Sequence, residues 1–268
     1  SLGLPLAESF MPILTFGLIS TLGWTVSWQI LSASILLIFI PLAIVLVSST
    51  SAFQRVPEAN GEKDTASVPT QDASRRQVLR DPKFYMIVPG LVFLPFFITG
   101  IFIHQNLLAE ARGWTMEWMA TCFIGFGVAR ITTNLVAGAL IDSFSARKVF
   151  IYYLLPLAAG LATLLMGEHR WLAMGYMILA GVTSSLSGLT SASLWAEIYG
   201  VRHLGAIKSM AATLMVLSTA LGPVVIGYGM ARQPDLTLLV FIAMILLITL
   251  LSWAALHNSQ SRKQAAVY

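Results

Sequence analysis

Residues Leu236 to Leu251 read LTLLVFIAMILLITLL, a stretch in which two threonines are the sole interruptions of the apolar side chains. A strand of a membrane barrel would alternate apolar and polar residues over about ten positions, and this stretch does not alternate. A helix needs about 20 mostly apolar residues to cross the hydrocarbon of a bilayer, and the apolar run continues to Leu256. The stretch therefore predicts a transmembrane helix.

The rest of the chain has the same character. Hydrophobic residues make up 57% of it and charged residues 10%, whereas soluble domains carry about 25% charged residues. The mean hydropathy is +0.79. We predict an all-α membrane protein with eight transmembrane helices. The predicted spans are Leu4 to Leu22, Thr25 to Val47, Phe84 to Leu107, Met116 to Ile141, Val149 to Met166, Trp171 to Ala196, Leu204 to Met230 and Leu236 to Leu256.

The basic residues between these spans predict their orientation, because cytoplasmic loops carry an excess of Lys and Arg. Three basic residues fall on one side: Arg112, Arg170 and Arg232. Twelve fall on the other: Arg55, Lys63, Arg75, Arg76, Arg80, Lys83, Arg147, Lys148, Arg202, Lys208, Arg262 and Lys263. The twelve-residue side is expected to be cytoplasmic, with the C-terminus inside. The net charge of +4 thus follows from membrane topology and gives no reason to expect a nucleic-acid partner.

Residues 48–82 differ from the rest in having few large apolar residues, mixed charges and three prolines. This composition predicts a mostly disordered cytoplasmic linker, whose basic end is either a topology signal or a contact with anionic lipid. Two helices before the linker and six after it make unequal halves. Many transporters consist of two six-helix halves, and the chain begins with Ser1. We therefore expect it to lack the first four helices of such a protein.

Metal, cofactor and enzymatic chemistry have no support in the sequence. Cys122 is the one cysteine, and the four histidines do not show the i, i+4 spacing of a helical metal site. No nucleophile and base pair is recognisable either. We predict no metal, no cofactor and no enzyme activity.

Arg130 is the most informative residue for function. It lies 14 residues after Met116 and 12 before Asp142, or about 21 Å and 18 Å along a helix, and hence near the middle of its span. An arginine at that depth costs at least about 2.5 kcal/mol and usually faces a cavity or an acidic partner. Its planar guanidinium matches a carboxylate. We predict that Arg130 binds a small organic anion and that Asn134, one turn on, orients it; the alternative is a structural arginine paired with a carboxylate of another helix.

Two further residues are candidates for coupling or binding. Glu8 lies between Pro5 and Pro12 in the first span, where a buried carboxylate can carry a proton. Glu8 is predicted to be either a proton-coupling residue or the ion-pair partner of Arg130. His104 ends the third span beside two polar residues, and can either bind substrate or titrate near neutral pH, or simply mark the helix's exit from the membrane.

Between the fourth and fifth spans, the segment from Gly138 to Lys148 reads GALIDSFSARK. It resembles the G-x-x-x-D-R-x-G-x-R-R signature of the major facilitator superfamily. The segment keeps Gly138, Asp142, Arg147 and Lys148, whereas Ser143 and Ser145 replace the usual Arg and Gly. Glu197, at the cytoplasmic end of the sixth span, resembles the acidic helix end of the same superfamily. The resemblance implies a cytoplasmic gating cluster of these residues: Gly138, Asp142, Arg147, Lys148 and Glu197.

The resemblance also implies a division of the chain. Residues 1–47 would be the last two helices of the N-terminal half, 48–82 the linker, 83–258 the six-helix C-terminal half and 259–268 a cytoplasmic tail. The implied location is a bacterial inner membrane, with lipid as the surrounding partner. The full-length protein is expected to be monomeric.

Within the superfamily the chain is most similar to prokaryotic monocarboxylate porters and the oxalate:formate exchanger, in which an arginine on the helix corresponding to the fourth span binds the carboxylate. Arg130 lies at that position. The exchanger's second cation has no counterpart here, and Phe126 replaces the Asp of the porters. These features predict a proton-coupled or exchanging transporter of a small monocarboxylate. The alternatives are an exporter of drugs or metabolites, in which Glu8 recognises the substrate, and a membrane sensor or accessory subunit that does not transport.

Overall fold

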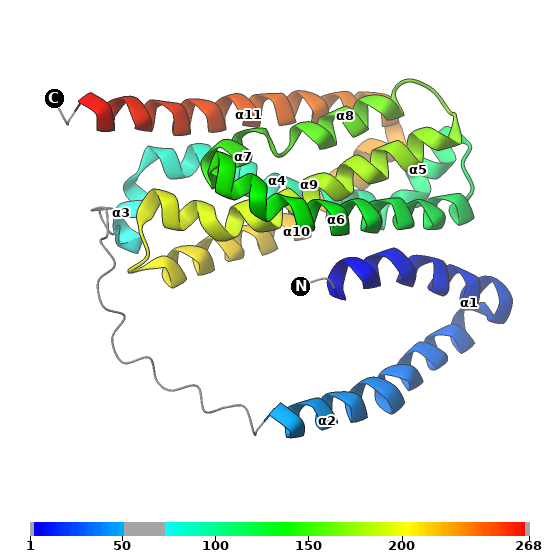
Figure 1. Cartoon of the computed structure of the whole chain (residues 1–268). Coiled ribbons are helices and arrows are strands. Elements are labelled where there is room, and N and C mark those ends of the chain that lie inside the picture. Colours follow the sequence, from blue (N-terminus) through cyan, green and yellow to red (C-terminus); the bar gives the residue numbers. More distant parts are fainter. Residues whose placement is uncertain (1–2, 51–72, 266–268) are drawn as a thin grey trace. The chain divides into compact units, whose positions relative to one another are not determined.

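The structure is a computed structural model that describes residues 3–50 and 73–265; within them it gives no side chain for residues 4, 46–50, 137–143, 192 and 257–265. The described residues form helices and no strands (Figure 1). The chain divides into two compact units, one made of Ser1–Pro12 with Gln71–Tyr268 and one of Ile13–Thr70. The prediction of an all-α membrane protein is confirmed.

The smaller unit contains most of α1 (Gly3–Ser34), the π-helix η1 (Ile35–Phe39) and α2 (Ile40–Thr50). Gly23 interrupts α1 with φ 77° and ψ 170°, a backbone conformation that only glycine adopts readily. The interruption falls between the first two predicted spans. Pro5–Val45 forms one apolar stretch of 41 residues, about 60 Å of helix, which is twice the hydrocarbon thickness.

The larger unit holds the other six stretches that are long and apolar enough to cross a membrane, so seven stretches among the described residues account for the eight predicted spans. Its helices lie side by side (Figure 1). They are α3 (Arg75–Arg80), α4 (Pro82–Ile103), α5 (Gln105–Arg112), α6 (Met116–Phe144), α7 (Ala146–Tyr152), α8 (Leu155–Leu164), α9 (Arg170–Tyr199), α10 (Leu204–Arg232) and α11 (Pro234–Ala265).

Two predicted spans of the larger unit are interrupted in the structure. The span predicted to end at Leu107 ends at Ile103, and His104 separates α4 from α5. The span predicted from Val149 to Met166 consists of two helices, α7 and α8, with Pro156 near the start of α8. Proline lacks a backbone N–H and fits the first turn of a helix better than its interior, so the span is broken where Pro156 begins a new helix.

The structure describes two parts of the predicted linker. Residues 48–50 belong to the end of α2, and the segment 73–82 folds onto the bundle. It contains α3, whose Val78 side chain is fully buried. Asp81 accepts a hydrogen bond from the backbone N–H of Lys83 at the start of α4 and another from the Tyr199 hydroxyl, at 2.9 and 3.1 Å. Residues 51–72 lie outside the described residues, and the predicted division into halves and linker stays a prediction.

Close packing in the larger unit depends on glycines where helices cross. The main contacts join α6 to α9 and α4 to α10. At Gly100 of α4 a Cβ would lie 2.6 Å from the carbonyl oxygen of Gly222 on α10, and at Gly222 a Cβ would overlap the carbonyl oxygen of Phe96. Small residues allow such backbone approach between membrane helices. The α4–α10 pair therefore depends on both glycines.

We expect Gly222→Ala to lower the midpoint of thermal unfolding in detergent by several degrees, because overpacking of this kind costs about 1–3 kcal/mol. Gly188→Ala is the matched control, since a Cβ at Gly188 of α9 meets nothing within 4 Å and alanine favours a helix more than glycine does. An unchanged midpoint for Gly222→Ala would show that α4 and α10 do not pack this closely.

Candidate functional site

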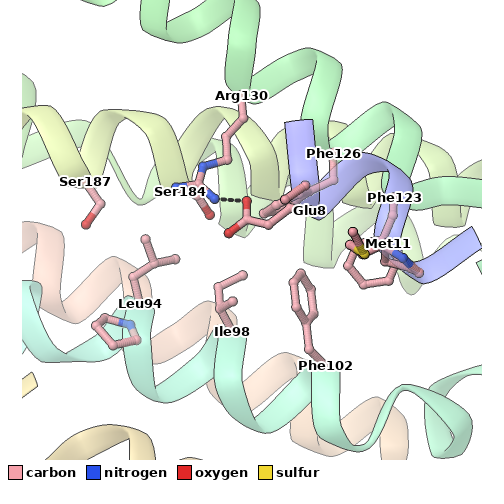
Figure 2. A pocket seen from close by; sticks show the side chains of 13 residues that line it. Glu8, Met11, Leu94, Ile98, Phe102, Phe123, Phe126, Arg130, Ser184 and Ser187 are labelled. Atoms are coloured by element: carbon pink, nitrogen blue, oxygen red, sulfur yellow. Dashed lines mark hydrogen bonds and ion pairs between the residues drawn. The ribbon is translucent and has the colours of Figure 1, made fainter. Parts of the chain in front are cut away.

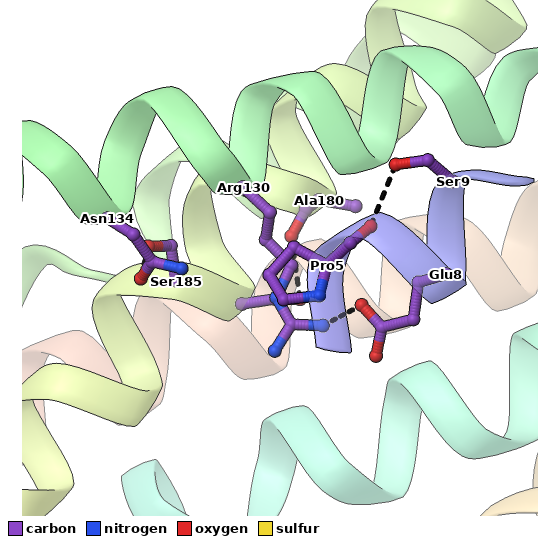
Figure 3. A network of polar contacts seen from close by, with 8 residues as sticks. Pro5, Glu8, Ser9, Arg130, Asn134, Ala180 and Ser185 are labelled. Atoms are coloured by element: carbon purple, nitrogen blue, oxygen red, sulfur yellow. Dashed lines mark hydrogen bonds and ion pairs between the residues drawn. The ribbon is translucent and has the colours of Figure 1, made fainter. Parts of the chain in front are cut away.

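Arg130 of α6 forms an ion pair with Glu8 of α1, between Nη1 of the guanidinium and Oε2 of the carboxylate (Figures 2 and 3). Both residues belong to the larger unit. The Arg130 side chain is 17% exposed and the Glu8 side chain 32% exposed. Of the two expectations for Glu8, coupling site or partner of Arg130, the structure shows the pairing. The coupling role stays a prediction.

The local sequence explains how Glu8 reaches Arg130. Gly127 lies almost one turn before Arg130, and a Cβ there would overlap the Ser9 hydroxyl and lie 3.0 Å from the carbonyl oxygen of Pro5. That same carbonyl accepts the Ser9 hydroxyl hydrogen bond at 2.8 Å (Figure 3). Pro5 and Ser9 of α1 thus pack directly against Gly127. The close approach of the two helices places the next side chain, Glu8, within reach of Arg130.

The ion pair stands in the wall of a cavity of about 480 Å³. Its lining comes from α1, α4, α6 and α9 (Figure 2). The lining residues are Ala7, Glu8, Met11, Pro12, Leu94, Pro95, Ile98, Phe102, Phe123, Phe126, Arg130, Ser184 and Ser187.

The guanidinium keeps hydrogen-bonding capacity beyond its contact with Glu8. Nε of Arg130 is buried and has no partner among the described residues. The guanidinium carbon lies 5.9 Å from the centre of the Phe126 ring, within the range of a cation–π contact. Because Arg130 also lines the cavity, an anion in the cavity can approach the planar fork of its guanidinium.

Asn134 and His104, both predicted to bind substrate, do not line this cavity. The amide oxygen of Asn134 accepts a hydrogen bond of 2.5 Å from the Ser185 hydroxyl, which joins α6 to α9 (Figure 3). The His104 ring packs on α10, where a Cβ at Gly227 would lie 2.5 Å from its Nε2. The geometry assigns both residues contacts between helices, and their predicted roles remain untested.

The predicted gating cluster is partly within view. The Glu197 carboxylate accepts a hydrogen bond of 2.9 Å from the backbone N–H of Ala146, the first residue of α7, and lies 3.6 Å from Nε of Arg147. Arg147 also donates to the main-chain oxygen of Glu197. Lys148 is exposed. Of Gly138 and Asp142 the structure describes the backbone alone, and the gating role stays a prediction.

Ser145, where the superfamily signature usually has glycine, has φ 64° and ψ 148°. Among the described residues it is the one non-glycine with positive φ. This region of backbone conformation is nearly exclusive to glycine and costs other residues about 1–3 kcal/mol. The turn between α6 and α7 therefore keeps the shape that a glycine would allow, with a serine strained in its place.

We expect Ser145→Gly to raise the midpoint of thermal unfolding by a few degrees, because relief of backbone strain outweighs the added entropy of a glycine in the unfolded chain. Ser145→Ala should leave the midpoint unchanged, since the serine side chain makes no capping hydrogen bond and alanine meets the same strain. Equal midpoints for all three proteins would contradict a strained turn.

We expect Gly127→Leu to separate the first turns of α1 from α6 and so to break the Glu8–Arg130 pair. The midpoint of thermal unfolding in detergent should fall by several degrees, because the added side chain would overlap Ser9 and the Pro5 carbonyl. Gly175→Leu is the matched control, since a Cβ at Gly175 of α9 meets nothing within 4 Å. Equal midpoints for the two variants would show that α1 and α6 do not meet here.

Comparison with known proteins agrees with this architecture. Residues 91–267, from within α4 beyond the end of α11, match the Major Facilitator Superfamily. Curated proteins and solved structures give no significant match. The match covers the α6–α7 turn, Arg130 and Glu197, and the fold is the helical membrane bundle expected of that superfamily. The chain therefore belongs to the Major Facilitator Superfamily and is a multi-pass membrane transporter.

Proposed function

We propose that the protein transports a small monocarboxylate-like anion by alternating access, with Arg130 binding the carboxylate and Glu8 carrying a coupled proton. The observation that supports this proposal is the Arg130–Glu8 ion pair in the wall of a largely apolar cavity. Arginine matches a carboxylate with two parallel hydrogen bonds. The resemblance to monocarboxylate porters at Arg130 agrees with this assignment.

The ion pair supplies a mechanism for coupling. While Glu8 is ionised, it compensates the charge of Arg130 and occupies its guanidinium, so a substrate anion does not bind there. A proton taken up by Glu8 removes the negative charge, so the guanidinium is left without compensation in apolar surroundings, which is costly. A substrate carboxylate can then take the place of Glu8. One proton and one anion enter together, and the net charge of the site stays the same.

Alternating access requires contacts that break at one end of the bundle while the binding site is kept. The Glu197 contacts to the backbone N–H of Ala146 and to Arg147 are suited to this, because they join the end of α9 to the start of α7 through polar groups. We assign the cytoplasmic gate to these residues. The basic loops support an orientation with the C-terminus inside, and the resemblance to prokaryotic porters supports a location in a bacterial inner membrane.

A second function is favoured by the lining of the cavity. Apart from the ion pair, most residues that line it are apolar, and Glu8 is more exposed than Arg130. An exporter of amphipathic or cationic compounds would use Glu8 to recognise the substrate and Arg130 only to hold Glu8. The two functions differ in which residue of the pair is essential.

The protein expressed from its complete gene and reconstituted in liposomes should accumulate labelled monocarboxylates when the outside is acidified. Arg130→Lys should lower uptake at least tenfold, because an ammonium cannot form the paired hydrogen bonds of the guanidinium. Arg232→Lys is the matched control, since Arg232 lies at the end of α10 over the ring of Tyr228 and does not line the cavity. Uptake that survives Arg130→Lys would end the proposal, and proton-driven dye export without acid uptake would favour the exporter.

Glu8→Gln separates proton coupling from substrate binding. A glutamine imitates the protonated carboxyl group, so the variant should still exchange labelled for unlabelled acid across the membrane. Accumulation driven by a proton gradient should fall to the level of empty liposomes. Proton-driven accumulation by Glu8→Gln protein would show that Glu8 does not carry the proton.

A further inference from the structure

The chemistry of the cavity beyond the ion pair restricts the substrate. Among the described residues that line it, the polar side chains besides Glu8 and Arg130 are Ser184 and Ser187. The Ser184 hydroxyl donates its hydrogen to the carbonyl oxygen of Ala180 at 2.8 Å. Ser187 is buried, with 8% of its surface exposed. A substrate rich in hydroxyl groups would lose its hydration here without gaining partners, which is unfavourable.

Three phenylalanines form an aromatic wall beside the ion pair: Phe102 of α4 with Phe123 and Phe126 of α6 (Figure 2). The ring centres of Phe102 lie 5.0 Å from Phe123 and 5.4 Å from Phe126, at interplanar angles of 69° and 74°. Edge-to-face contacts of this kind are the favoured geometry for aromatic pairs. The wall is thus a set of interlocked rings. Phe126 is buried, whereas Phe102 and Phe123 are half-buried and can contact an apolar group in the cavity.

The same surface continues along α4. Leu94 and Ile98 also line the cavity, and residues 94, 98 and 102 recur every four positions, so their side chains share one face of the helix. Figure 2 shows Ile98 between Leu94 and Phe102, all three on the helix facing the ion pair. The apolar surface therefore extends past Arg130 in both directions rather than stopping at the aromatic wall.

The size of the cavity points the same way. Its volume of about 480 Å³ falls within the roughly 300–1,000 Å³ of pockets that enclose drug-sized ligands. An acid of the size of lactate or pyruvate would reach Arg130 but leave most of the apolar surface in contact with water. Apolar surface removed from water contributes about 25 cal/mol per Å², so a larger apolar substrate would gain binding energy that a small one cannot.

We infer that the substrate is an amphipathic monocarboxylate, whose single carboxylate binds Arg130 and whose bulky apolar or aromatic body lies on Phe102, Phe123, Leu94 and Ile98. This inference rests on the proposed function and specifies its substrate class. A second carboxylate is disfavoured, because Arg130 is the one cation among the lining residues and an unpaired buried charge is costly.

The inference is tested by measuring how well unlabelled compounds compete with the uptake of a labelled monocarboxylate by liposomes in exchange mode. The competitors are acetate, butyrate, hexanoate and 3-phenylpropionate, which share one carboxylate and differ in apolar size, with hexanamide as the neutral counterpart of hexanoate. Inhibition should strengthen about fourfold for each methylene that is buried, the factor that corresponds to about 0.8 kcal/mol. Hexanamide should compete at least tenfold more weakly than hexanoate, because it lacks the charge that binds Arg130.

Variants of the aromatic wall complete the test. Phe123→Ala should reduce the preference for 3-phenylpropionate over acetate by roughly tenfold, in line with the loss of one aromatic contact surface. Phe144→Ala is the matched control, since Phe144 lies on the same helix, is 54% exposed and does not line the cavity. Correct folding of each variant is checked by its thermal midpoint.

The possible failures are distinguishable. Equal competition by acetate and hexanoate, with exchange still lost in Arg130→Lys protein, would overturn the apolar-body inference and leave the anion transporter intact. Equal competition by hexanoate and hexanamide would overturn the inference and remove the carboxylate from the proposed function as well. A preference for 3-phenylpropionate that Phe123→Ala leaves unchanged would overturn the assignment of the apolar body to this wall.

Discussion

The ion pair between Arg130 and Glu8 is the interaction on which the rest of the site depends. A guanidinium inside a membrane span is tolerated when it faces an acidic partner or a cavity, and Arg130 has both beside it. The compensation requires the first turns of α1 to lie against α6, which only a glycine at position 127 allows. The ion pair between Arg130 and Glu8 therefore depends on Gly127.

Close approach at glycines sets the shape of the cavity on its other sides as well. A Cβ at Gly181 of α9 would overlap the carbonyl oxygen of Phe126 on α6, and the Gly100–Gly222 contact holds α4 against α10. In lipid, helices gain little from burying apolar side chains against one another, so backbone approach and van der Waals contact determine their association. Tight contacts behind the cavity leave the larger side chains, Phe102, Phe123 and Leu94 among them, to project into it.

The end of α9 gathers contacts from three other segments. The Glu197 carboxylate accepts a hydrogen bond from the backbone N–H of Ala146 and forms an ion pair with Arg147, both in α7. The Tyr199 hydroxyl donates a hydrogen bond to Asp81, and the Tyr199 carbonyl accepts one from the backbone N–H of Ala73. Ser185 of the same helix binds Asn134, nearer the cavity. Helix α9 therefore connects the wall of the cavity to the polar contacts at one end of the bundle, and a displacement of α9 would be felt at both.

The sequence by itself determined the membrane spans, because crossing the hydrocarbon requires a long apolar helix whatever its neighbours are. It also singled out Arg130, since a midspan charge is costly in any fold. The sequence did not determine which residues contact each other. Glu8 and Arg130 are 122 positions apart, and the sequence was compatible with Glu8 as a coupling site or as the ion-pair partner of Arg130. The sequence showed Phe126 as a replacement for the Asp of the porters, whereas in the structure it belongs to an aromatic wall. Asn134 and His104 contact neighbouring helices. Those outcomes depend on where helices approach each other, and only the tertiary structure decides that.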